Sequence, residues 1–110
     1  MIEEEEDFIS KGVRNFWSSN GTDHKLIPPN FRKVLRALLV HLDTATSLDD
    51  IKGGLGRSKG FKALVGHTNR YELQVNGNYR LTFNCDDPST GRVTKIDLED
   101  VHRKGGAKKH

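Results

Sequence analysis

The segment FKALVGHTNRYELQVNGNYRLTFNC, residues 61–85, predicts the centre of an antiparallel sheet. In its runs 70–75 and 78–85, apolar side chains recur at every second position, which is typical of strands with one buried face. The Asn76-Gly77 pair between the runs favours a two-residue type I′ turn, because both residues tolerate the positive φ angles that this turn needs. The segment therefore predicts a hairpin of two strands.

Two further strands are predicted on either side of the hairpin, over about 61–65 and 92–100, and two helices precede them. Ser10 is a suitable N-cap for a first helix that runs to about Ser19. The Asn-Gly pair at 20–21 then ends this helix, because either residue can adopt the left-handed conformation of a helix C-terminus.

The second helix is predicted from apolar residues at helical spacing after an Asn30 cap. Its expected buried face consists of Phe31, Val34, Leu35, Leu38, Leu39, Leu42 and Ala45. The order of helix, helix and four antiparallel strands predicts an α+β fold, with two N-terminal helices packed on one face of a small sheet.

Length and composition favour a single domain over residues 1–110 with a small core, because only 34% of the 110 residues are apolar. The acidic head 1–7 and the basic tail 103–110 are predicted to be disordered. Cys85 is the only cysteine, which excludes an internal disulfide and any multi-cysteine metal site. Without a long apolar run or a signal-peptide pattern, we expect a cytoplasmic protein with no membrane contact.

The charge is distributed unevenly along the chain. Residues 8–110 contain all 18 Lys and Arg but only 10 of the 15 Asp and Glu, a net charge of +8. A basic body of this kind favours a nucleic-acid partner. The stretch KGGLGRSKG, residues 52–60, is either a flexible surface loop or a loop that contacts phosphate. It lacks the spacing of a nucleotide-binding P-loop.

Strand alternation also predicts a polar face opposite the core. If the apolar positions point inward, the outward set is Glu72, Gln74, Arg80, Thr82 and Asn84. Such a face can bind a ligand without cost to the core.

Near the end of the last strand, Asp100 and His102 form a second candidate pair. A carboxylate beside an imidazole orients the ring and raises its pKa, which suits proton transfer. Alternation places both residues with Leu98 on the inner face, whereas Arg80 points outward. We therefore expect the strand to end or bulge near Glu99 and bring the three side chains together.

Five segments resemble HigB-type toxins of the RelE/ParE superfamily. They are FISKGV (8–13), LDTATSLDDI (42–51), FKALVG (61–66), NGNYRLTF (76–83) and IDLEDVH (96–102). The resemblance implies a RelE-like fold and a toxin that cuts mRNA in the ribosomal A site with the RNA's own 2′-OH as nucleophile. It implies no metal or other cofactor. The implied partners are the ribosome, mRNA and a HigA-like helix-turn-helix antitoxin.

By position, the resemblance implies that Arg80 contacts phosphate and that Asp100 and His102 are the acidic and imidazole pair. Lys62 would act as the base or share the negative charge of the phosphorane. One departure is Val101, which stands where the family pattern has tyrosine, so that an aromatic side chain able to stack on a base is missing.

Other cations around the hairpin and at the chain end complete the predicted RNA-binding set. They are Arg57, Lys59, His67, Arg70 and Arg103. Two alternatives remain open at this point. One is a ParE-like toxin that binds gyrase and cleaves no RNA, and the other is a module that binds RNA or the ribosome without catalysis.

Overall fold

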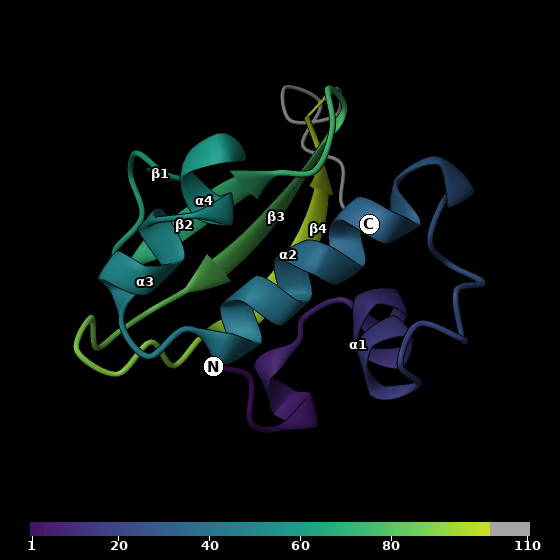
Figure 1. Ribbon diagram of the computed structural model, residues 1–110, viewed down its shortest axis with the longest axis horizontal. Coiled ribbons are helices and arrows are strands. Elements are labelled where there is room, and N and C mark those ends of the chain that lie inside the picture. Colours follow the sequence, from purple (N-terminus) through teal and green to yellow (C-terminus); the bar gives the residue numbers. More distant parts are fainter. Residues whose placement is uncertain (102–110) are drawn as a thin grey trace.

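The computed structural model describes residues 1–101, in which helices cover one face of an antiparallel sheet (Figure 1). The sheet order is β1-β2-β3-β4, so that neighbours in sequence are neighbours in space. The strands are β1 (Lys62–Ala63), β2 (Arg70–Gln74), β3 (Tyr79–Asn84) and β4 (Thr94–Asp100). The predicted α+β fold is confirmed, although β1 is shorter than expected.

The two predicted helices are present as α1 (Lys11–Ser18) and α2 (Arg32–Thr44). Ser10 caps α1, since its hydroxyl accepts a hydrogen bond from the Val13 N–H. The pair at 20–21 follows the helix with φ angles of 60° and 87°, as predicted. The predicted cap of α2 was wrong, because residues Pro29–Phe31 form a 3-10 turn (η2) and the helix begins one residue after it.

The core lies between α2 and the inner face of the sheet. The predicted apolar stripe of α2 is confirmed, since Leu35, Leu38, Leu39 and Leu42 are all fully buried. The inward positions of the hairpin are buried as well, among them Leu73, Leu81, Phe83 and Cys85. Each buried leucine contributes about 1.5–3 kcal/mol through loss of apolar surface, so this stripe is the main reason why α2 lies across the sheet.

The predicted type I′ turn was wrong. Val75 N–H donates to Tyr79 O over 3.0 Å, which leaves the three residues 76–78 as the loop. Neither Asn76 nor Gly77 has the positive φ angle that a type I′ turn requires. The Asn76 side-chain oxygen instead accepts the N–H groups of Asn78 and Tyr79, over 2.8 and 2.9 Å. The asparagine thus closes the turn with its side chain.

The glycine-rich stretch 52–60 is not an open loop. It contains the end of α3 (Leu48–Lys52) and a further short helix, α4 (Leu55–Ser58). A Cβ atom on Gly56 would lie 1.7 Å from the Ile51 carbonyl oxygen, so that close backbone packing requires this glycine. The prediction of a flexible loop was therefore wrong, and packing between the two helices explains the glycine.

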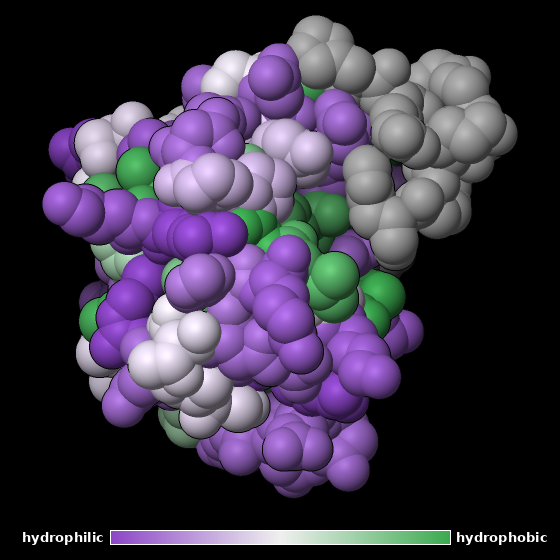
Figure 2. All heavy atoms as spheres, turned by 90° about the vertical axis from the view of Figure 1, so that its right-hand side faces the viewer, coloured by the Kyte–Doolittle hydropathy of each residue, from purple (hydrophilic) through white to green (hydrophobic). Residues whose placement is uncertain are grey.

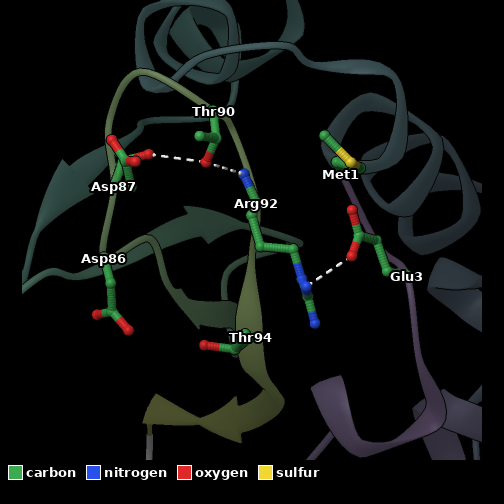
Figure 3. A pocket seen from close by; sticks show the side chains of 7 residues that line it. All are labelled: Met1, Glu3, Asp86, Asp87, Thr90, Arg92 and Thr94. Carbon is green, nitrogen blue, oxygen red and sulfur yellow. Dashed lines mark hydrogen bonds and ion pairs between the residues drawn. The ribbon is translucent and has the colours of Figure 1, made fainter.

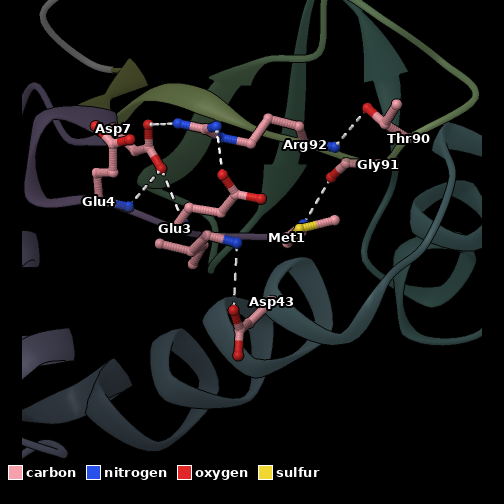
Figure 4. Close-up of polar contacts among 9 residues, drawn as sticks. Met1, Glu3, Glu4, Asp7, Asp43, Thr90, Gly91 and Arg92 are labelled. Atoms are coloured by element: carbon pink, nitrogen blue, oxygen red, sulfur yellow. Dashed lines mark hydrogen bonds and ion pairs between the residues drawn. The ribbon is translucent and has the colours of Figure 1, made fainter.

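The acidic head is ordered, which contradicts its predicted disorder. Residues Glu5–Asp7 form a 3-10 turn (η1), and Asp7 is only 2% exposed. The Arg92 guanidinium binds Asp7 Oδ1 and Glu3 Oε1, each over 2.6 Å (Figure 4). Two acids of the head therefore share a cationic partner, Arg92, which lies two residues before β4. The predicted disorder of 103–110 lies outside the described residues.

The Asp7 carboxyl shows what holds the head in place. Burial alone raises its pKa, but hydrogen bonds from Arg92 and from the N–H groups of Glu4 and Glu3 outweigh burial and lower the pKa below its ordinary value of 3.8. The same contact raises the pKa of Arg92. A hollow of about 450 Å³ separates this cluster from the 86–90 loop (Figure 3).

The last strand, β4, contains a bulge before its end. Thr82 pairs with Asp97 and Asn84 pairs with Thr94, so that one extra residue is accommodated on β4 opposite Phe83. Lys95, with a φ angle of 50°, lies in this bulge. The strand then continues through Glu99 and ends at Asp100, so its end lies where we expected it, but the bulge lies at Lys95 and not near Glu99.

Among the described residues, the helices are too short and too polar for any of them to cross a membrane.

Candidate functional site

The polar face of the sheet brings two cations onto one carboxylate. Lys62 of β1 pairs in register with Glu72 of β2, and its Nζ lies 3.9 Å from Glu72 Oε2. Arg80 of β3 approaches the same oxygen, with its Nε at 3.5 Å. Because β2 lies between β1 and β3, Glu72 is placed between the two cations.

The two cations differ in how firmly the protein holds them. The Arg80 side chain is 23% exposed, and its Nη1 also donates to the carbonyl oxygens of Asn76 and Tyr79, over 2.7 and 3.1 Å. Lys62 is 69% exposed, and the long distance to Glu72 leaves its ammonium largely in solvent. Arg80 is thus a fixed positive charge, whereas Lys62 is a cation that an incoming ligand can reach.

A pocket of about 190 Å³ opens beside this group. The outward side chains of the sheet that line it are Glu72, Arg80, Thr82 and Glu99, and the 64–67 loop and the end of β4 complete the lining. The loop contributes the exposed His67 and also Val65, whose side chain is 98% exposed. The pocket therefore combines the Arg80 guanidinium, carboxylates, an imidazole and an apolar tip within a small volume, and Lys62 lies beside it rather than in its lining.

Asp100 reaches the same pocket from the end of β4, although its strand position is on the other face. It pairs with Tyr79, whereas Arg80 pairs with Glu99, so alternation directs the Asp100 side chain toward the helical side. Asp100 and Val101 nevertheless border the pocket at the strand end. The predicted partners His102 and Arg103 lie outside the described residues.

Arg70, predicted to bind RNA, has protein partners in the structure. Its Nη1 donates to Asn84 Oδ1 and Lys95 O over 2.7 and 3.0 Å, and its Nη2 donates to Thr82 Oγ1 over 2.8 Å. Glu99 Oε2 lies 3.5 Å from the same Nη2. The side chain is only 12% exposed, so we assign Arg70 to holding β2, β3 and β4 together.

The remaining predicted RNA contacts fall into two groups. His67 borders the pocket, as described above. Arg57 lies in α4 and Lys59 is its C-cap, and neither lines the pocket. Within residues 1–101, no three His, Cys, Asp or Glu side chains are placed to hold a metal ion.

Sequence reasoning gave no role to Glu72 or Glu99, although both lie in the pocket. Glu72 was placed correctly on the polar face, and it is 9% exposed. Its approach to Lys62 depends on the register between β1 and β2. Because β1 is only two residues long, its sequence shows no alternation from which that register could be predicted. A carboxylate on the same predicted sheet face as Arg80 is the one cue that could have marked it.

These features define a class of protein. A helical layer on one face of a four-stranded antiparallel sheet, with a charged pocket on the other, is consistent with a RelE-like toxin. Residues 6–98 match the family described as the RelE-like toxin of type II toxin–antitoxin system HigB. The chain belongs to this HigB-like toxin family. Comparison with curated proteins gives no match.

Membership of a type II toxin family implies a protein antitoxin as partner. The match includes Lys62, Glu72 and Arg80 and ends at Leu98. Asp100 and His102 therefore lie beyond the matched residues, and their roles stay predictions.

Proposed function

We propose that this toxin is a ribosome-dependent mRNA interferase, a metal-independent endoribonuclease that cuts mRNA in the ribosomal A site. The observation that carries the proposal is the convergence of Lys62 and Arg80 on Glu72 beside a small open pocket. A phosphodiester that enters this pocket meets the fixed positive charge of Arg80, and the accessible ammonium of Lys62 lies beside the pocket at Glu72. We further propose a HigA-like antitoxin and a site of action in the cytoplasm.

The reaction needs three contributions from side chains. A base removes the proton of the RNA 2′-OH, and the oxygen then attacks the adjacent phosphorus. Cations stabilise the charge of the phosphorane, and an acid protonates the departing 5′-oxygen, leaving a 2′,3′-cyclic phosphate and a 5′-OH. No step of this sequence requires a metal ion when side chains supply all three contributions.

Arg80 is the group best suited to stabilise the phosphorane. Its Nε and Nη1 are held by protein acceptors, and among residues 1–101 no hydrogen bond uses its Nη2. A guanidinium held in this way needs little reorganisation when charge develops on the phosphate. Lys62 is the second cation or the base, and His102 with Asp100 is the proposed proton-transfer pair.

Primer extension on mRNA after brief induction tests this function, in parallel with cleavage of purified mRNA with and without ribosomes. We expect cuts within translated regions that appear only when ribosomes are present. Equal cleavage of free mRNA would refute ribosome dependence. Intact mRNA together with altered DNA supercoiling would instead favour a gyrase-binding toxin, and ribosome binding without cleavage would favour a non-catalytic module.

A further inference from the structure

An apolar hollow of about 470 Å³ lies between the start of α1, the 26–28 loop and β4. Its apolar lining consists of Ile9, Leu26, Ile27, Pro28, Tyr79 and Leu98. The side of the molecule that carries α1 shows hydrophobic residues gathered in a strip among hydrophilic ones (Figure 2). We call this hollow the α1–β4 groove.

Two large apolar side chains of the groove are exposed to solvent, Ile9 at 56% and Leu26 at 67%. Neither lies on a loosely held segment. The Ile9 N–H donates to Ile96 O of β4 over 2.8 Å, beside a parallel bridge between Phe8 and Ile96. Exposed apolar groups on a rigid support lose little conformational entropy when a partner covers them, so they are suited to binding.

Leu26 is held in its exposed position from two sides. Arg32 of α2 donates to the carbonyl oxygens of Ile27 and His24, over 2.8 and 3.2 Å, and so fixes the loop. On the other side, a Cβ atom on Gly12 would lie 2.8 Å from the Leu26 Cβ. Gly12 lies within α1, where glycine costs up to about 1 kcal/mol relative to alanine, and it allows the loop to approach the helix closely.

The helical side of the groove is basic, whereas β4 carries acids on both sides of Leu98. Residues 11–36, which supply its helical side, contain six Lys and Arg against one acid, Asp23. Lys11 itself lines the groove, and Lys25 precedes the exposed Leu26. An apolar centre with cations along its helical side is complementary to a segment that carries large apolar side chains together with Asp or Glu.

We propose that the α1–β4 groove binds an acidic segment of the protein antitoxin, which inserts at least one large apolar side chain between Ile9 and Leu26. The proposal rests on membership of the type II toxin family and is independent of the nuclease activity proposed above. Two exposed aliphatic side chains at the groove favour a protein over RNA, because nucleic-acid binding relies on cations and stacking aromatic rings.

The groove is separate from the candidate cleavage pocket. Tyr79 lines the groove and Arg80 lines the pocket, and consecutive residues of a strand point to opposite faces. Substitutions at Ile9 and Leu26 therefore leave the Lys62, Glu72 and Arg80 cluster unchanged, and the two sites can be tested independently.

The test is isothermal titration of the toxin with its purified protein antitoxin. The double variant Ile9→Glu/Leu26→Glu and each of its single variants are compared with Val40→Glu, which places one carboxylate on a 40% exposed apolar position of α2 outside the groove. We expect the double variant to bind about 30-fold more weakly or worse, the usual effect of losing an interface hot spot. The control should bind within about threefold of the unaltered toxin, and thermal unfolding should confirm that every variant is folded.

Two results would overturn the proposal. One is antitoxin affinity of the folded double variant within about threefold of the unaltered toxin. The other is unchanged antitoxin binding with weaker ribosome association, which would assign the groove to the ribosome. Cleavage of ribosome-bound mRNA by the double variant is expected to be unchanged. If the unaltered toxin cleaves no mRNA, the proposed nuclease function fails, but the binding comparison still decides the role of the groove.

Discussion

Replacing Arg80 with alanine separates its structural from its catalytic contribution. The Nε of Arg80 lies 3.5 Å from Glu72 Oε2, and the two side chains are 23% and 12% exposed. At that distance the attraction is about 5 kcal/mol for an effective dielectric constant of about 20, but the desolvation of both groups offsets most of it. We expect Arg80→Ala to lower the free energy of unfolding by about 1–3 kcal/mol, mainly because Glu72 loses its closer partner.

The fold should persist, because small proteins have a stability of about 5–15 kcal/mol. Much of the lost stability should return in Arg80→Ala/Glu72→Gln, since a neutral amide near the remaining Lys62 costs less than a partly buried carboxylate without Arg80. Cleavage should not return. Loss of a charge that stabilises the transition state costs about 10²–10³ in rate, and the double variant still lacks that charge.

The assay is single-turnover cleavage of ribosome-bound mRNA by the unaltered toxin, both variants and Glu72→Gln alone, with urea unfolding of each. Two outcomes would refute the reasoning. If folded Arg80→Ala cleaves at the unaltered rate, Arg80 does not act on the phosphate. If the double variant regains both stability and cleavage, Arg80 matters only as the partner of Glu72.

Three other predictions concern the remaining charged groups. His102→Ala should keep ribosome affinity within a few-fold and reduce cleavage by about 10²–10⁴, whereas a toxin truncated after Val101 that cleaves normally would exclude His102 from the chemistry. Ribosome binding should weaken steeply with salt, because the body carries a net charge of +8, and a flat response in filter binding would point to a partner recognised by shape. The pKa of Asp7 is lowered in the folded state, so Asp7 stabilises the protein above its ordinary pKa of 3.8, and this contribution disappears as the pH falls through the folded value. Asp7→Asn should therefore lower the melting temperature clearly at pH 7 and progressively less as the pH falls below 3.8, and a loss that does not shrink with acid would contradict this assignment.

Periodicity predicted the parts of the fold that depend on local pattern. The stripe of α2 and the inward set of β2 and β3 were identified because burial repeats every 3.6 or 2 residues. The ordered acidic head could not be found in this way, since Arg92 and Asp7 are 85 residues apart. The helix α4 was missed because glycine usually indicates a loop, and only the packing against Ile51 explains Gly56.

The site depends on the register between β2 and β3. The alternation of apolar residues in the two strands indicates this register correctly, whereas the predicted two-residue turn contradicts it. A two-residue loop at 76–77 would place Gln74 opposite Tyr79, and directly opposed residues lie on the same face of a sheet. The inward sets of both strands fall on odd-numbered residues, which requires a loop with an odd number of residues. The observed loop of 76–78 pairs Gln74 with Arg80, and it keeps Glu72 and Arg80 on the polar face together. Hydrophobic alternation in both strands was therefore the stronger signal, and it overrides the Asn-Gly preference because a slip of one residue would expose the core of the hairpin.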